Sequence, residues 1–281
     1  ALVFVGAAGI AVRSVAPHLK GKAVDPAVVV VDEAGQFAVP ILSGHLGGAN
    51  DLARRIAGAC GGTPVITTAT DAAGKFAVDE WARRQNCALL EPERILPISA
   101  SVLRGEPITV TSQWPIAGEC LPGVFLGEKG AVRLGLSAED DDALHLVPRI
   151  GVLGVGCKRD TPRERIEAVF QSFLAESRIF GQCVVSAATI DRKGDEPGLL
   201  AFCRDHGWDL ATFSAEELSR AEGDFASSSF VAEAVGVDNV CERAAVLFSG
   251  GTLIVRKYAD RGVTMALAAK PYAPDWRWKD E

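Results

Sequence analysis

Residues 43–50 hold the densest set of chemically useful groups in the sequence. They read Ser43-Gly44-His45-Leu46-Gly47-Gly48-Ala49-Asn50, between a strand-like apolar run and a helical pattern. Amides at a helix start carry partial positive charge that suits anions, and glycine lets a ligand approach the main chain. An imidazole transfers protons near neutral pH. We therefore predict His45 as a catalytic base, with ligand binding by Ser43, Gly44, Gly47, Gly48 and Asn50.

The alternative for this loop is purely structural. The glycines then form only a turn, Asn50 caps the following helix, and His45 is a surface or core histidine. The segment matches neither the GxGxxG fingerprint nor a phosphate-binding P-loop, so no generic motif decides between the two interpretations.

A second polar cluster, Thr67-Thr68-Ala69-Thr70-Asp71, follows the strand-like run 64–67. Ligands of open α/β sheets bind outside the carboxyl ends of strands, so this cluster and the 43–50 loop are expected to face one crevice. We predict that Asp71 orients His45 or a water molecule, and that Thr67, Thr68 and Thr70 bind ligand oxygens. The alternative is helix capping by Thr70 or Asp71 and ordinary strand-forming threonines.

A third segment, residues 154–162, also places glycines before a helix start. Arg159 can grip a carboxylate through two hydrogen bonds, and we predict ligand binding by Gly154, Gly156 and Arg159. Thr161 and Glu164 suggest a capping box around Pro162. Cys157 is either a thiolate activated by the helix N-terminus or, more commonly for cysteine, a small packing residue.

The elements around these segments alternate between strand-like runs and helical patterns, which predicts an α/β fold. We expect two three-layer α/β/α domains, over residues 1–90 and 149–281, with mixed, largely parallel sheets. A proline-punctuated, β-containing middle segment over residues 91–148 joins them. Residues 32–35 are expected to form a hairpin turn.

Composition excludes several classes of protein. No apolar run approaches the roughly 20 residues of a membrane span, and net charge −7 without a basic aromatic patch argues against nucleic acid. The seven scattered cysteines are typical of reduced thiols in the cytoplasm. No residue spacing indicates a metal site, so we expect none. Because the chain opens directly in a strand-like run, we expect a further N-terminal segment in the whole protein.

Several segments together resemble one family. Residues 2–13, 22–33, 43–50 and 64–81 resemble, in order and spacing, the N-terminal domain of the CbiG family of anaerobic cobalamin biosynthesis. Residues 154–162 and 240–266 resemble its C-terminal domain, which is shared with CobE proteins. Members usually carry some tens of residues before the opening strand, and this chain does not.

The resemblance implies a hydrolase acting on a carbon–carbon bond. It opens the lactone of cobalt-precorrin-5A and releases acetaldehyde, giving cobalt-precorrin-5B. Cobalt arrives in the corrinoid substrate, so the resemblance implies no cofactor. The alternatives are a non-catalytic corrinoid carrier and a generic nucleotide-binding protein. A homodimer and contacts with neighbouring pathway enzymes stay open.

Overall fold

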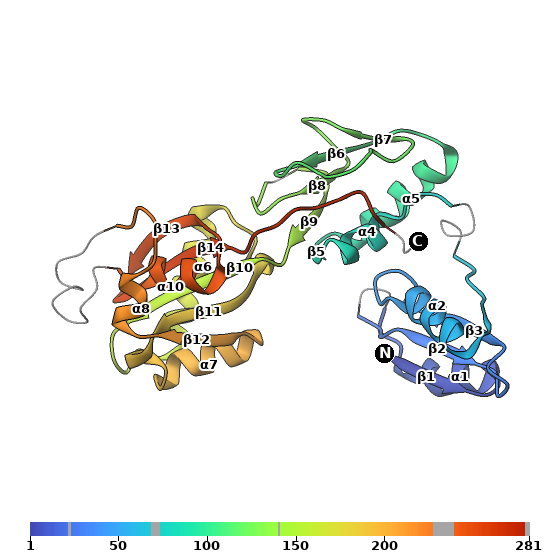
Figure 1. Ribbon diagram of the computed structural model, residues 1–281, viewed down its shortest axis with the longest axis horizontal. Coiled ribbons are helices and arrows are strands. Elements are labelled where there is room, and N and C mark those ends of the chain that lie inside the picture. Colours follow the sequence, from blue (N-terminus) through green and yellow to red (C-terminus); the bar gives the residue numbers. More distant parts are fainter. Residues whose placement is uncertain (22–23, 69–73, 140, 227–238, 279–281) are drawn as a thin grey trace. The chain divides into compact units, whose positions relative to one another are not determined.

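A computed structural model describes the chain apart from residues 22–23, 69–73, 140, 227–238 and 279–281 (Figure 1). The described residues form two compact units. Unit 1 comprises residues 1–135, 142–146 and 274–278, and unit 2 comprises residues 136–141 and 147–273. The boundaries expected near residues 90 and 148 stay predictions. The last described residues, 274–278, belong to unit 1, whereas the residues that precede them belong to unit 2.

The first sheet of unit 1 has the strand order β1-β2-β3-β4. The strands are β1 (Leu2–Val5), β2 (Val28–Val31), β3 (Phe37–Leu42) and β4 (Thr63–Pro64). β1 is parallel to β2 and β3 is parallel to β4, whereas β2 and β3 are antiparallel. Helix α1 (Ala8–Val15) follows β1, and helix α2 (Ala49–Cys60) follows β3.

The sequence of β2 explains its place inside this sheet. Its four valines are all buried, as expected for a β-branched run with both faces covered. The expected hairpin between β2 and β3 is confirmed: Gly35 N donates to Asp32 O at 2.9 Å, and Phe37 N donates to Asp32 Oδ1 at 2.6 Å. Small alanines on α2, including Ala53 and Ala57, pack closely onto the strands.

The second sheet of unit 1 has the order β5-β9-β8-β6-β7. Its strands are β5 (Cys87–Leu89), β6 (Ile108–Ser112), β7 (Val124–Leu126), β8 (Val132–Leu134) and β9 (Leu144–Pro148). The pairs β6–β7, β6–β8 and β8–β9 are parallel. Helices α4 (Val78–Arg84) and α5 (Ile95–Arg104) belong to the same part of the chain.

The end of the chain packs against α4. The indole of Trp81, which is fully buried, stacks on Trp276 with ring centroids 5.3 Å apart. Trp81 Nε1 also donates to Asp275 O at 2.7 Å. Phe76 meets Trp278 edge to face. These contacts fix α4 through residues nearly two hundred positions away in the sequence.

Unit 2 contains one sheet with the order β12-β11-β10-β14-β13. Its strands are β10 (Gly151–Cys157), β11 (Val184–Ile190), β12 (Asp209–Phe213), β13 (Thr252–Asp260) and β14 (Val263–Ala269). Its helices are α6 (Arg163–Ser177), α7 (Pro197–His206), α8 (Ala215–Ser219) and α10 (Val240–Ser249). β10, β11 and β12 are parallel, whereas β14 is antiparallel to both β10 and β13.

Helices cover both faces of this sheet. Val152 packs with Ala244 of α10 and Leu218 of α8 on one face. Because side chains alternate along a strand, Val155 faces the other way, as does its cross-strand partner Met265. Tyr258, which pairs with Met265, contacts Phe173 of α6 on that second face. The predicted α/β class with mixed, largely parallel sheets is therefore confirmed.

Candidate functional site

The loop 43–50 folds back onto its own helix. Gly48 N donates to His45 O at 2.9 Å, Ala49 N to Ser43 O at 3.1 Å, and Asn50 N to Gly44 O at 3.0 Å. The start of α2 is thus capped by carbonyl groups of the loop that precedes it. That network occupies the Gly48 amide, and ligand binding by Gly48 stays a prediction.

Close packing explains the glycines of this loop. A side chain at Gly47 would meet the Ser43 Cβ at 2.4 Å, and one at Gly44 would meet Asn50 Oδ1 at 2.8 Å. Gly48 adopts the left-handed conformation, with φ +78°, and is the N-cap of α2. The expected capping by Asn50 is wrong. That residue lies inside the first turn, fully buried, and its Nδ2 donates to Thr68 Oγ1 at 3.0 Å.

His45 is buried and pairs with a carboxylate from another helix. Its Nδ1 lies 3.1 Å from Oδ1 and 3.3 Å from Oδ2 of Asp79, which is 1% exposed. In the neutral imidazole, donation from Nδ1 to Asp79 leaves the lone pair on Nε2, which is then the proton-accepting atom. A base whose ring is oriented by a buried carboxylate is the arrangement used in acyl-transfer triads. The predicted base therefore has a partner suited to that role.

Asp71 and Thr70, two of the predicted site residues, lie outside the described residues, so their roles stay predictions. The strand expected over residues 64–67 is shorter, because β4 ends at Pro64. Thr67 is exposed, and Thr68 is half-buried against Asn50. That hydrogen bond brings the threonine cluster and the 43–50 loop together, as the strand-end reasoning predicts.

Arginine side chains lie close to this loop. Arg83 donates to both Asp51 and Glu80, and Arg84 Nη2 lies 3.4 Å from Asp51 Oδ2. Burial raises the pKa of Glu80, although the Arg83 guanidinium acts in the opposite direction. A cavity of about 450 Å³ adjoins the network. Its lining comprises Ala1, Ala27, Gly47, Gly48, Asp51, Leu52, Arg55, Arg83 and Arg84.

The glycines of unit 2 are not in a loop, contrary to the prediction. Gly154 and Gly156 both lie in β10. A Cβ at Gly154 would stand 1.8 Å from Cys241 O, so this glycine is required for the close approach of α10 to the strand. Gly154 is buried beneath that helix, and its predicted contact with a ligand has no support in this position. Ligand binding by Gly156 and Arg159 stays a prediction.

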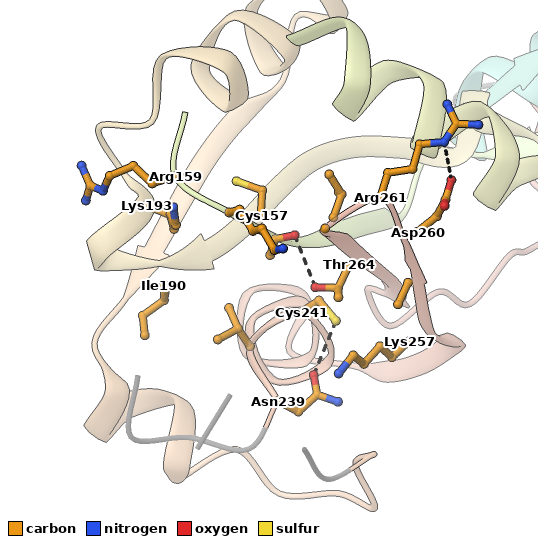
Figure 2. A pocket seen from close by; sticks show the side chains of 16 residues that line it. Cys157, Arg159, Ile190, Lys193, Asn239, Cys241, Lys257, Asp260, Arg261 and Thr264 are labelled. Atoms are coloured by element: carbon orange, nitrogen blue, oxygen red, sulfur yellow. Dashed lines mark hydrogen bonds and ion pairs between the residues drawn. The ribbon is translucent and has the colours of Figure 1, made fainter. Parts of the chain in front are cut away.

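A cavity of about 700 Å³ lies at the carboxyl ends of β10 and β11, beside the first turn of α10 (Figure 2). Gly156, Arg159 and Ile190 line it from these two strand ends. Figure 2 shows Arg159 and Lys193 to one side of the cavity, with Lys257 and Arg261 to the other. A cavity of this size is typical of a ligand site.

The capping box predicted at Thr161 is wrong, and the surroundings of Cys157 favour one of its two interpretations. Helix α6 begins at Arg163 with Pro162 as its N-cap and no side-chain cap, and Thr161 Oγ1 donates instead to Lys158 O at 2.7 Å. Cys157 ends strand β10 and lines the cavity beside the first turn of α10. Burial raises the pKa of its thiol to about 11. The packing interpretation of Cys157 is therefore favoured over an activated thiolate.

Sequence reasoning missed Asp79 and, apart from Arg159, the basic side chains around both cavities. The signal for Asp79 is its place in the run Phe76-Ala77-Val78-Asp79-Glu80-Trp81, where two adjacent acids interrupt apolar residues. Both acids are buried, which is uncommon without a specific partner. The basic residues gave no such signal, because Lys158, Lys193, Lys257 and Arg261 are scattered along the sequence.

Comparison with known proteins agrees with the sequence resemblance. The family profile described as Cobalamin synthesis G N-terminal matches residues 1–71, and that described as Cobalamin synthesis G C-terminus matches residues 151–268. A cobalt-precorrin-5A hydrolase from Priestia megaterium is 33% identical, covering 96% of this chain and 79% of the relative. The chain belongs to the CbiG family.

Two further proteins related to CbiG are also similar to this chain. A cobalt-precorrin-5A hydrolase from Salmonella typhimurium is 35% identical over 95% of this chain and 81% of its own length. Protein CobE from Sinorhizobium sp is 32% identical over 42% of this chain and 78% of its own length. Both resemblances stated from the sequence, to CbiG and to CobE, are confirmed.

The described residues also bear on metal binding and on membrane crossing. Nowhere in the described parts of the chain do three or more His, Cys, Asp or Glu side chains gather as a metal-binding group. Among the same residues, no helix has both the length and the apolar character that a membrane crossing requires. The expectations of no cofactor and of a cytoplasmic location stay predictions.

Proposed function

We propose that this protein is a cobalt-precorrin-5A hydrolase. The observation that carries the proposal is the identity of 33% and 35% to two hydrolases of that name, across 96% and 95% of the chain. An alignment that spans nearly the whole chain includes both family domains. The reaction adds water to cobalt-precorrin-5A and gives cobalt-precorrin-5B and acetaldehyde.

The first step opens the lactone. His45 Nε2 takes a proton from water as the water oxygen attacks the lactone carbonyl, and the ring C–O bond then breaks to give a carboxylate and an alcohol. Asp79 holds the imidazole in orientation through Nδ1 and stabilises its protonated form. Since the Gly48 amide is bonded to His45 O, donors for the oxyanion are expected from the Gly47 amide and from hydroxyl groups of the site. The hydroxyls of Thr67 and Thr68 are our candidates.

The second step breaks a carbon–carbon bond. The freed alcohol loses its proton to a base, its oxygen forms the carbonyl of acetaldehyde, and the electrons of the broken bond pass to the macrocycle. One imidazole serves both steps if it releases the first proton to solvent. Cobalt enters as part of the substrate, and we propose that the enzyme needs no cofactor of its own and acts in the cytoplasm.

Incubation with cobalt-precorrin-5A tests this proposal. Mass spectrometry is expected to show a product whose mass equals that of the substrate plus water minus acetaldehyde. Trapping with a hydrazine reagent is expected to recover the acetaldehyde. Water labelled with ¹⁸O is expected to place one label in the new carboxylate. Tight binding of the substrate with no change in its mass would contradict the hydrolase and indicate a corrinoid carrier.

A further inference from the structure

The cavity of unit 2 concentrates positive charge on an acidic protein. The chain carries a net charge of −7, yet the described side chains that line this cavity include five bases and one acid, Asp260. The five bases are Lys158, Arg159, Lys193, Lys257 and Arg261. Because the whole protein repels anions, such a local reversal of charge favours an anionic ligand at this one place.

Three of the five bases stand in no ion pair with the described residues, and Glu196 acts on Arg159 only through a longer-range charge interaction. Among the described residues, Lys158, Arg159 and Lys257 make no ion pair. By contrast, Lys193 Nζ lies 2.9 Å from Glu196 Oε2, and Arg261 Nε lies 3.3 Å from Asp260 Oδ2. The three unpaired bases come from two different segments, the end of β10 and the middle of β13. Their separation suits a ligand with several acid groups better than one small anion.

The inner surface of the cavity is apolar. Ile190, Val240 and Val263 line it, together with the Cys157 and Cys241 thiols. In Figure 2 the labelled Arg159 and Lys193 lie to one side of the Cys157 and Cys241 thiols, and Lys257 and Arg261 lie to the other. Apolar contact with the body of a ligand, combined with cations around it, matches a ring that bears carboxylates on its periphery.

We infer that this cavity binds one carboxylate-bearing edge of the corrinoid macrocycle, with Lys158, Arg159 and Lys257 pairing with its acetate and propionate groups. The inference rests on the proposed function for the identity of the macrocycle. The local excess of positive charge and the apolar lining together indicate the class of ligand, which is an amphipathic polycarboxylate. A volume of about 700 Å³ holds an edge of such a ring and leaves the remainder outside.

Calorimetric titration with two corrinoid probes tests the inference. Cobyrinic acid has free acetate and propionate groups, and its heptamethyl ester has the same ring without the charges. The full chain is compared with the triple variant Lys158→Gln, Arg159→Gln, Lys257→Gln. We expect cobyrinic acid to bind the variant at least about tenfold more weakly. Binding of the ester is expected to be equal for both proteins.

A matched control removes the same charge elsewhere. Lys129, Arg165 and Lys270 are exposed and line no part of this cavity, and Lys270 follows the opposite end of β14. The triple variant Lys129→Gln, Arg165→Gln, Lys270→Gln is expected to bind cobyrinic acid as the unmodified chain does. Equal weakening by both triple variants, or no weakening by the cavity variant while its melting temperature is unchanged, overturns the inference.

Measurement of turnover distinguishes a failure of this inference from a failure of the proposed function. If acetaldehyde is released and the cavity variant raises KM with little change in kcat, both stand. If acetaldehyde is released and the cavity variant alters neither KM nor the binding of cobyrinic acid, the cavity assignment fails and the function stands. If no acetaldehyde forms but the cavity variant selectively weakens binding of the acid, the cavity assignment stands and the reaction is wrong.

Discussion

The loop 43–50 and the segment 154–162 look alike in sequence, since each places glycines between a strand and a helix, but they differ in structure. In the first, the polar groups satisfy one another: loop carbonyls cap α2, and His45 pairs with Asp79. In the second, the glycines lie in a strand, and five basic side chains line a cavity. The comparison teaches that one sequence pattern can form a loop that caps its own helix in one unit and a strand beside a cavity lined by basic side chains in the other.

The largest effect is expected from His45→Gln. Loss of a general base lowers turnover by about 10²- to 10⁴-fold, whereas binding of cobyrinic acid is expected to stay within threefold. Acetaldehyde release under single-turnover conditions measures the change. His18→Gln, at an exposed histidine, is the matched control and is expected to have normal turnover. Near-normal turnover of the His45 variant would remove this residue from the mechanism and with it the proposed difference between the two regions.

The reactivity of Cys157 tests the comparison in unit 2. Burial raises its pKa from the ordinary 9.0 to about 11, so the thiolate form is about 100-fold scarcer at pH 8 than for an unperturbed thiol. We expect slow alkylation by iodoacetamide that accelerates about tenfold per pH unit until the pH approaches 11. Peptide mass spectrometry compares Cys157 with the exposed Cys60. Equal rates at pH 8 would support the activated thiolate instead.

Asp79→Asn tests whether the carboxylate positions the imidazole. In a Ser-His-Asp triad, loss of the orienting carboxylate costs roughly 100-fold less in kcat than loss of the base itself, so we expect kcat to fall by about 10- to 100-fold with KM unchanged. The imidazolium also loses its negatively charged partner, so the acidic limb of the pH–rate profile is expected to move to lower pH. A variant that only loosened the fold would lower kcat without moving that limb. Asp32→Asn, at an exposed hairpin turn away from His45, is the control.

The smallest effect is expected from Gly154→Ala. The new methyl group would collide with Cys241 O and displace α10, at a cost of about 1–3 kcal/mol in the free energy of unfolding. Since Val240 and Cys241 line the cavity, cobyrinic acid is expected to bind less tightly as well. Urea denaturation and calorimetry measure the two changes. Gly58→Ala serves as the control, because nothing lies within 4 Å of its added Cβ and its helical position favours alanine.

Sequence reasoning was most successful where local pattern decides the structure. The buried valines of β2, the hairpin at residues 32–35 and the α/β class all follow from hydrophobic periodicity and turn chemistry. His45 could be singled out because its loop is compact in sequence. The resemblance to CbiG and CobE rested on several such segments in order.

The remaining features of the site depend on long-range packing. Asp79 reaches His45 from a helix 34 residues later in the sequence, and no spacing rule connects the two. The cations of the unit 2 cavity converge only because β13, β14 and the ends of β10 and β11 meet there. At Gly154, the sequence cannot distinguish a flexible loop glycine from one required by a neighbouring helix. The structure distinguishes these two cases by showing which atoms lie next to Gly154.

The packing of residues 274–278 on α4 also bears on how the chain folds during synthesis. Trp276 and Trp278 are translated after the residues of unit 2. The aromatic cluster around Trp81 therefore cannot form until these two residues have left the ribosome. A ribosome stalled before residue 274 would display all residues of unit 2, whereas α4, which carries Asp79, would lack the side chains that pack against it.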